Sequence, residues 1–386
     1  MATALFVFDH KYPCDENSNY YYSSGFDAEF FNRYYQIFDR FDIFGREKKV
    51  YHKEKLKKIL YPSKFYLVES NKNLILAKDK MEKAIESVDC VIARMPSLLG
   101  SLAIYLAKKN KKPYIVEVVA CTYDALINSV SWKRRILARP AEIFYRFILR
   151  NNPYTIYVTK EFLQKKYPCK GQKIACSNVT LPSVEKTALE CRQRKNNKIA
   201  YKKCIKIGTC STLNVDFKGQ KYVIQALPKL VDMGYDIFYE MVGDGDGTWL
   251  LKIAKELGVE NRVKIIGHLD HEEIFDWLDT IDLYVHSSCQ EGLSRAIIEA
   301  MSRACPIVAT DAGGVHELIN KDYIVPVKSS IGIIKGINKI IEDGFNKVSL
   351  DNFENSKEYE MDRLYKRRKE FYYKFLKEAR LRWKDI

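Results

Sequence analysis

Residues 282–310, "DLYVHSSCQEGLSRAIIEAMSRACPIVAT", place a polar loop and an amphipathic helix between two short apolar runs. The runs at 283–285 and 307–309 have the apolar character of buried strands. A helix between two such strands predicts a βαβ unit, in which the strands are parallel and covered on both faces. This stretch therefore favours a doubly wound α/β sheet.

The same alternation extends over residues 204–344. Apolar segments that we predict to be strands lie at 204–209, 236–243, 262–267, 282–288, 306–310 and 323–327. Amphipathic segments that we predict to be helices lie at 219–234, 248–259, 271–281, 291–301, 314–319 and 330–344. The N-terminal half repeats this theme with predicted strands at 4–8, 41–44, 65–70, 89–93, 113–119 and 154–159, and predicted helices at 26–41, 98–110 and 140–149.

A chain of 386 residues is expected to form two domains. We predict an N-terminal domain over 1–183, a polar linker over 184–200, a second domain over 201–345 and a basic C-terminal helix over 346–386. Two interpretations stay open for that helix. It is either a packing helix with a solvated face or a helix that returns to the N-terminal domain.

The net charge of +15 favours anionic partners such as nucleic acid, anionic lipid or a phosphorylated substrate. Nucleic acid is disfavoured because no zinc-finger spacing, basic zipper or aromatic RNA-binding signature occurs. The ten cysteines form no CxxC pair, which is typical of buried thiols in a reducing compartment. Without a signal-peptide pattern or an apolar stretch of membrane-spanning length, we expect a cytoplasmic protein, peripheral on the inner face of the cell membrane.

Two glutamates in the opening stretch, Glu291 and Glu299, have seven residues between them. Eight helical steps separate side chains by about 80° around the axis and about 12 Å along it. The two carboxylates therefore suit opposite ends of an elongated ligand, with a phosphate held between them at the unpaired amides of the helix start. A nucleotide-sugar has this order of groups. The alternative is that Glu291 caps the helix and Glu299 is a solvated surface residue.

The stretch "SSCQEGLSRAIIEAMSRACPIVATDAGGVHELI" (287–319) resembles the group 1 retaining glycosyltransferases of the GT-B fold. That family has two glutamates at this spacing, then a Pro-Ile/Val-Val-Ala-Thr strand and a Gly-Gly loop. The segment "KIGTCSTLNVDFKGQKYVIQAL" (206–227) resembles the first strand and helix of the family's donor domain. Over 1–200 the likeness is looser and is to enzymes that build bacterial surface polysaccharides. The resemblance implies two Rossmann-like domains facing across a cleft.

The resemblance also implies roles for individual residues. Glu299 would bind the ribose hydroxyls, Glu291 would contact the donor sugar near the reacting carbon, and Lys218 would neutralise the leaving diphosphate. The backbone amides that would hold the diphosphate are those of Gly292, Leu293, Ser294 and Arg295.

Four further positions follow from the resemblance. Gly25 corresponds to a loop glycine that lies across the cleft from the diphosphate, although simple turn chemistry also explains it. Thr212 stands where many family members carry an arginine, so Arg295 or a residue of the first domain would supply the second charge. Family members often carry a histidine after the strand that corresponds to 113–119, and this chain has none there. Glu117 and Asp124 are the nearby polar residues that are candidates for its place.

Two other segments allow a functional and a plain interpretation. In "GDGDG" (243–247), Asp244 and Asp246 mimic a metal-binding Asp-x-Asp motif, but the glycines favour a turn. The segment "SWKRRILARPAEIFYRFILR" (131–150) mixes basic and apolar side chains, as a helix on anionic lipid does. A core helix with a basic outer face would look the same.

We therefore expect a metal-independent, retaining hexosyltransferase that needs no cofactor besides its UDP- or GDP-linked sugar donor. Its acceptor would be a hydroxyl of a glycan, lipid-linked and destined for a surface polysaccharide. Its other partner would be an anionic membrane surface. The alternatives are a sugar-nucleotide epimerase of the same fold, a basic nucleic-acid-binding protein and a non-catalytic glycan-binding subunit.

Overall fold

The computed structural model describes residues 2–23, 25–50, 56–61, 63–69, 74–202 and 204–381. The chain divides into two compact units, and neither is continuous in sequence. Unit 1 contains Met1–Ala120, Glu142–Cys176 and Leu364–Ile386, and unit 2 contains Cys121–Ala141 and Ser177–Arg363.

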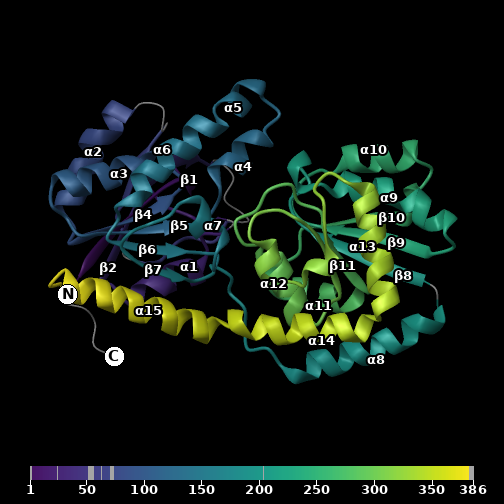
Figure 1. The fold of residues 1–386 in the computed structure, drawn as a ribbon. Coiled ribbons are helices and arrows are strands. Elements are labelled where there is room, and N and C mark those ends of the chain that lie inside the picture. Colours follow the sequence, from purple (N-terminus) through teal and green to yellow (C-terminus); the bar gives the residue numbers. More distant parts are fainter. Residues whose placement is uncertain are drawn as a thin grey trace. The chain divides into compact units, whose positions relative to one another are not determined.

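Unit 1 is built on a seven-stranded parallel sheet of order β3-β2-β1-β4-β5-β6-β7 (Figure 1). The strands are β1 (Thr3–Cys14), β2 (Arg40–Lys49), β3 (Phe65–Val68), β4 (Cys90–Met95), β5 (Tyr114–Val118), β6 (Tyr154–Tyr157) and β7 (Gln172–Ala175). The helices of unit 1 are α1 (Ala28–Tyr35), α2 (Leu74–Glu86), α3 (Leu98–Lys109), most of α6 (Ala138–Arg150), α7 (Phe162–Lys166) and most of α15 (Met361–Glu378). The strand order reverses between β1 and β4, so the carboxyl ends of these two strands form the switch point where such sheets bind ligands.

Unit 2 is built on a six-stranded parallel sheet of order β10-β9-β8-β11-β12-β13. The strands are β8 (Cys204–Cys210), β9 (Asp236–Val242), β10 (Val263–Gly267), β11 (Leu283–His286), β12 (Ile307–Thr310) and β13 (Ile324–Val325). The helices are α4 (Thr122–Ile127), α5 (Trp132–Ile136), α8 (Lys186–Lys202), α9 (Gln220–Asp232), α10 (Thr248–Glu256), α11 (His271–Thr280), α12 (Arg295–Ser302), α13 (Ser330–Asp343) and α14 (Phe345–Ser356). Its switch point lies between β8 and β11.

Both sheets confirm the predicted fold class, an α/β protein with two doubly wound parallel sheets. In unit 2, α9 contacts α10 and α13, whereas α12 contacts α11 and α14, so the helices form two groups. The apolar runs formed strands because they are covered from both sides: the residues of β11 and β12 are all buried.

The segment 184–200, which we expected to be a linker, is mostly helix α8. Although this segment is polar, one of its side chains makes buried contacts with residues far away in the sequence. The buried guanidinium group of Arg192 donates to the carbonyl oxygens of Ile281 (2.5 Å), Leu278 (2.7 Å) and Arg303 (3.2 Å). A side chain of α8 therefore supplies hydrogen-bond donors to carbonyl groups near the ends of other helices. The local sequence pattern does not predict this role.

Other boundaries also differ from the predictions. The helix predicted over 26–41 ends at Tyr35, because Phe41 enters the core on β2. The helix predicted over 314–319 is only a 3-10 turn, Val315–Glu317. The predicted C-terminal helix is two helices, α14 and α15, with a 3-10 turn between them. Ser70, at the end of a predicted strand, and residues 382–386 lie outside the described residues.

A buried polar cluster joins α15 to the sheet of unit 1. The Glu117 carboxylate on β5 accepts hydrogen bonds at Oε1 from the hydroxyl groups of Tyr34 (2.8 Å) and Tyr372 (3.0 Å). Arg33 and Arg368 are buried nearby. Burial lowers the pKa of Arg33 to about 10 against the opposing charge of Glu117, whereas burial of Arg368 is outweighed by nearby groups, Glu117 among them, that raise its pKa. Glu117 is therefore the counter-charge of the core under α15, and it is not available as the binding group considered above.

Aromatic packing fixes the same helix on the neighbouring strand. The ring of Tyr154 on β6 lies 5.3 Å from the rings of both Phe371 and Phe375, measured between centroids. The geometry is edge-to-face, the arrangement that aromatic quadrupoles favour. Residues of α15 thus complete the core of unit 1.

Candidate active site

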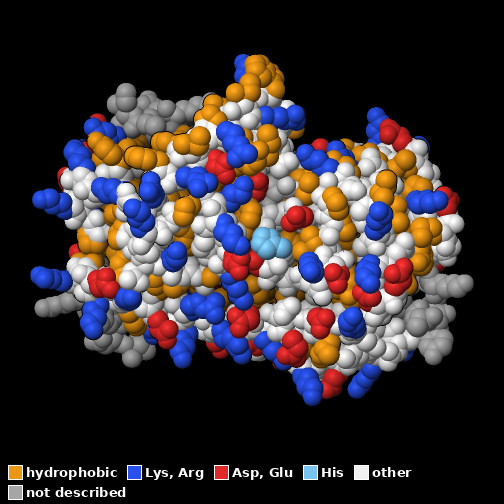
Figure 2. Space-filling view, viewed as in Figure 1, with side chains coloured by type: hydrophobic (Ala, Val, Ile, Leu, Met, Phe, Trp, Pro, Cys, Tyr) orange, Lys and Arg blue, Asp and Glu red, His pale blue; other side chains and the backbone are white. Residues whose placement is uncertain are grey.

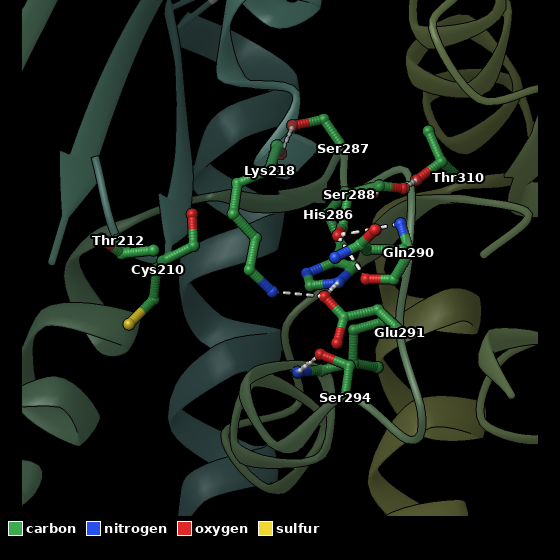
Figure 3. A network of polar contacts seen from close by, with 12 residues as sticks. Cys210, Thr212, Lys218, His286, Ser287, Ser288, Gln290, Glu291, Ser294 and Thr310 are labelled. Carbon is green, nitrogen blue, oxygen red and sulfur yellow. Dashed lines mark hydrogen bonds and ion pairs between the residues drawn. The ribbon is translucent and has the colours of Figure 1, made fainter. Parts of the chain in front are cut away.

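The switch point of unit 2 brings together the two predicted catalytic residues. Lys218 Nζ lies 2.6 Å from Glu291 Oε1 (Figure 3). Lys218 ends the 3-10 turn Asp216–Lys218 that follows β8, and Glu291 lies in the loop after β11. Strands that adjoin in the sheet have thus placed two residues 73 positions apart in direct contact.

Gly219 sets the position of Lys218. It has a φ of 74°, and a Cβ there would meet the carbonyl oxygen of Ser287 at 2.0 Å. The hydroxyl group of Ser287 donates to the carbonyl oxygen of Lys218 at 3.0 Å. The Lys-Gly pair is therefore needed for two reasons: glycine permits the close approach, and the approach aims the lysine at the loop after β11.

The Gly-Gly pair holds the Glu291 loop from the other side. Gly314 N donates to the carbonyl oxygen of Gly292 at 2.8 Å. Gly313 has a φ of 62°, and a Cβ there would meet the carbonyl oxygen of Glu291 at 2.2 Å. The glycines that we expected to open a helix instead support the loop that carries Glu291.

His286 is a site residue that the sequence analysis missed. Its Nε2 lies 3.2 Å from Glu291 Oε1, and its side chain is 3% exposed. Its Nδ1 is buried and has no hydrogen-bond partner among the described residues. Its position at the end of an apolar strand, five residues before Glu291, was the available signal, but a histidine there also suits a core.

Two donors converge on one oxygen of Glu291. Burial would raise the pKa of Glu291, but the charge of Lys218 and the hydrogen bond from His286 outweigh it and hold the pKa far below its ordinary value. The stabilisation from this pairing is present above the ordinary carboxyl pKa of about 4.3 and is lost only as the pH falls through the lowered value. Glu291 is therefore an anion throughout the neutral range.

Helix α12 begins at Arg295, not at Gly292, and Ser294 is its N-cap. The Ser294 hydroxyl accepts from Ile297 N at 3.3 Å, so Glu291 does not cap the helix. Because Glu291 lies in the loop before the helix, the eight-step helical separation from Glu299 does not apply. The exposed Arg295 stands on the first helical turn, where its charge lies beside the helix start.

Glu299 is only 8% exposed, which excludes a solvated surface role. Its Oε1 lies 3.3 Å from Nε2 of His271, the first residue of α11. His271 is a second histidine that the sequence analysis missed. Each of the two glutamates therefore has its own histidine.

The partly buried Cys210 thiol, at the end of β8, is subject to the charges of three predicted site residues. Burial raises its pKa to about 12, and the Glu299 charge adds to this, whereas Arg295 and Lys218 oppose it. Because electrostatic effects of this kind fall off with distance, the three predicted site residues lie around the same sulfur atom.

Thr212 follows the same strand, and its hydroxyl group is already engaged. It donates to the carbonyl oxygen of Asp244 at 3.1 Å, while Gln220 donates to its carbonyl oxygen at 3.0 Å. Gly243, Gly245 and Gly247 all have positive φ, so "GDGDG" forms a turn against Thr212. The exposed Asp244 carboxylate pairs with His268 at 2.7 Å. Within the described ranges, no group of three or more His, Cys, Asp or Glu is placed to hold a metal ion.

Gly25 belongs to unit 1 and lies in a tight turn. Ser23 and Phe26 exchange backbone hydrogen bonds across this turn (2.8 and 3.3 Å), and Gly25 has a φ of 76°. The turn explains the glycine, and a donor-binding role for it stays a prediction. The polar candidate Asp124 lies in the first turn of α4.

Comparisons with known sequences show which proteins the chain resembles. Residues 193–358 match the family described as glycosyl transferases group 1. The chain is 37% identical to protein CapJ of Staphylococcus aureus over 345 residues, which are 87% of this chain and 86% of that protein. It is 31% identical to the α-D-kanosaminyltransferase of Streptomyces kanamyceticus over 130 residues, about a third of each chain (33% and 34%).

Solved structures share the fold at low sequence identity. The Anabaena protein Alr3699/HepE, solved with UDP and glucose, has a TM-score of 0.68 at 16% identity, over 97% of this chain and 100% of that chain. The lipopolysaccharide outer core galactosyltransferase WaaB has a TM-score of 0.59 at 14% identity, over 96% and 99%.

Proposed function

Because the chain belongs to the group 1 glycosyl transferases of the GT-B fold, we propose that it moves a sugar from a nucleoside diphosphate to a hydroxyl group of a glycan, with retention at the anomeric carbon. The observation that carries the site assignment is the 2.6 Å contact between Lys218 and Glu291 at the switch point of unit 2. We assign the acceptor to the lipid-linked glycans of surface polysaccharide synthesis, at the inner face of the cell membrane.

In the reaction, the bond from the anomeric carbon to the diphosphate oxygen breaks, and a bond to the acceptor oxygen forms on the same face. The acceptor's proton passes to the departing phosphate oxygen, so the nucleoside diphosphate leaves with it. Lys218 has three N–H donors and uses one on Glu291, which leaves two for the phosphate where negative charge develops. The helix start at Arg295 presents backbone amides to the same anion.

Glu291 and Glu299 bind the two ends of the donor in this proposal. Glu299 accepts from the ribose hydroxyls, and Glu291 lies at the sugar. Glu291 is ionised and its side chain is mostly covered, so it stabilises positive charge on the sugar ring as the leaving-group bond lengthens. The charges that act on the leaving group come from the protein, and the proposal needs no metal ion.

The variant Glu299→Ala tests the assignment of Glu299 to the ribose hydroxyls. Its effect should be large, because hydrogen bonds to a buried carboxylate are among the stronger ones. A screen of nucleotide-sugars by thermal shift first identifies the donor. The variant is expected to bind that donor about 10- to 100-fold more weakly, which corresponds to the roughly 1.5–3 kcal/mol of a charged hydrogen bond. Glu272→Ala, which removes an exposed carboxylate on α11, is the control.

Unchanged donor affinity in Glu299→Ala would remove the ribose assignment. The same assay separates the other candidate functions. An epimerase converts the donor without any acceptor. A nucleic-acid-binding protein shows salt-dependent binding to DNA or RNA and no turnover of nucleotide-sugar. A glycan-binding subunit binds glycan without donor turnover.

Helices α5 and α6 carry the features that support membrane contact. Ile143 and Phe147 on α6 are 66% and 78% exposed, and basic side chains lie between and beside them. Figure 2 shows hydrophobic side chains next to lysines and arginines over α5. Among the described residues, no helix combines the length and the apolarity that crossing a bilayer requires. We propose that these helices lie in the interface of an anionic leaflet.

The double variant Ile143→Ser/Phe147→Ser is expected to bind vesicles with 30% anionic lipid at least about tenfold more weakly, because each apolar side chain contributes roughly 1–2 kcal/mol on burial. Cosedimentation measures this. Leu60→Ser, which changes an exposed apolar side chain of unit 1 that lies outside α6, is expected to bind as the wild type does. Equal binding by the double variant would exclude α6 as the contact.

A further inference from the structure

The switch point of unit 1 carries a cluster of cations. Strand β1 pairs with β4 only as far as Val7 and Ala93, and its register with β2 then shifts between Val7 and Lys11. Phe8, Asp9 and His10 therefore lie in the bulged part of β1, beside Arg94 on β4. This is the position in a doubly wound sheet at which ligands bind.

Arg94 lies beside two aromatic rings that stack on each other. Its guanidinium carbon lies 5.4 Å from the centroid of Phe8 and 5.5 Å from that of Phe26. The His10 ring stacks on Phe26 at 4.1 Å, and His10 Nε2 lies 2.7 Å from the Ser23 hydroxyl. These contacts fix the guanidinium plane. Its Nε is buried and has no hydrogen-bond partner among the described residues.

Two more cations, Arg46 and Lys48, lower the pKa of His10 as Arg94 does. Arg46 uses Nε and Nη2 on the carbonyl oxygen of Asp9, at 2.8 and 2.5 Å, which leaves Nη1. Lys48 is exposed on β2. Burial, followed by the charges of Arg94, Arg46 and Lys48, lowers the pKa of His10 to about 4, so His10 is neutral and the positive charge comes from these three residues.

The nearby carboxylates have hydrogen-bond donors other than these cations, although Glu117 Oε2 is buried and has no partner among the described residues. Asp9 accepts from the backbone N–H groups of Leu98 and Leu99 (2.7 and 3.2 Å) at the start of α3. Glu117, opposite Arg94 in the sheet, accepts from two tyrosine hydroxyls and lies among two buried arginines. No ion pair among the described residues joins Arg94, Arg46 or Lys48 to a carboxylate. None of the three cations therefore has a carboxylate from the described part of the chain in direct contact with it.

A single side chain links this cluster to the proposed membrane helix. The charge of Asp9 raises the pKa of Tyr145 on α6, in addition to the larger effect of burial, so Tyr145 lies close to the switch point. Its neighbours on α6, Ile143 and Phe147, are exposed to solvent. One face of the helix thus approaches the cations while exposed apolar side chains of the same helix suit lipid.

We propose that Arg94, Arg46 and Lys48 bind the phosphate group of a lipid-linked acceptor. This rests on the proposed function, and it names the charged part of that acceptor and the residues that recognise it. The guanidinium group of an arginine presents its N–H groups in a planar fork, the geometry that binds phosphate oxygens bidentately.

The test measures binding of citronellyl diphosphate, a short lipid diphosphate, by isothermal titration. The donor site is first saturated with the nucleoside diphosphate that the thermal shift screen selects. Arg94→Gln is expected to weaken binding of the probe at least about tenfold, because a charge-assisted contact contributes roughly 1.5–3 kcal/mol. Lys48→Gln, at an exposed position that does not support the fold, is expected to weaken it about threefold. Lys170→Gln removes an exposed charge elsewhere in unit 1 and is the control.

Three results overturn the proposal. The first is wild-type affinity for the probe in both Arg94→Gln and Lys48→Gln. The second is an equal loss of nucleoside diphosphate affinity in Arg94→Gln, which assigns the cluster to the donor. The third is equally tight binding of inorganic diphosphate, which removes the lipid from the assignment.

The outcome is distinguishable from failure of the proposed function. If the wild-type chain binds no nucleotide-sugar, but Arg94→Gln weakens binding of the probe, the anion site stands and the transferase assignment is refuted. If donor turnover is normal but binding of the probe does not depend on Arg94, the transferase assignment stands and the anion site is refuted.

Discussion

Lys218→Ala is expected to lower the rate of sugar transfer by about 100- to 1,000-fold, the usual cost of removing one preorganised group from developing negative charge. The loss should fall on kcat more than on KM, because the diphosphate is more negative when the sugar bond is breaking than when the donor is bound. Release of nucleoside diphosphate in a coupled assay measures both constants.

Lys221→Ala is the matched control. Lys221 lies three residues further along, on α9, and pairs with Asp216 at 2.8 Å instead of with Glu291. Its replacement removes the same charge from the same turn and should leave turnover within about twofold, since its ion pair is near the surface. Lys218→Arg should recover part of the rate. Equal rates for Lys218→Ala and Lys221→Ala would show that the leaving group is stabilised elsewhere.

Glu117→Ala is expected to destabilise unit 1 by about 3–5 kcal/mol, since it leaves buried arginines without their counter-charge. The two tyrosine hydroxyl groups also lose their acceptor. For a unit of this size, the midpoint of thermal unfolding should fall by roughly 10 °C. Differential scanning calorimetry, with hydrogen exchange at the β5 and β6 amides, measures the loss and locates it.

Glu117→Gln keeps an acceptor for the tyrosines but removes the charge, and it should fall between the wild type and Glu117→Ala. Glu86→Ala, at the exposed end of α2, controls for the loss of a glutamate from unit 1. If Glu117→Ala and Glu86→Ala unfold at the same temperature, the carboxylate is not the counter-charge of this core.

Sequence reasoning worked best where a pattern is local. The strands of unit 2 could be predicted because each is a short apolar run bounded by turns. Lys218 and Glu291 lie together because they are in loops at the carboxyl ends of strands β8 and β11, and their roles stay predictions. Sequence reasoning failed where a residue acts at long range. Arg192 supports carbonyl groups 86–111 residues away, so the helix that carries it resembles a polar linker. Helix α2 and strand β7 were not predicted at all.

The histidines of the site show a different limit. His286 and His271 lie 5 and 28 residues from the glutamates that they contact. Neither interval is a helical or a strand repeat that places side chains together. The packing of α11 against α12 brings His271 to Glu299, whereas His286 meets Glu291 because the loop after β11 turns back on the end of that strand.

The order in which a ribosome makes this chain has a consequence for unit 1. Its first stretch ends at Ala120, but the stretch that covers β5 and β6 begins at Leu364, after nearly all of unit 2. At about 5–20 residues per second, translation of the intervening segment lasts on the order of ten to fifty seconds. During that interval Tyr154 and the surface around Glu117 have no cover, so the nascent chain presents apolar surface to chaperones while unit 2 is being synthesised.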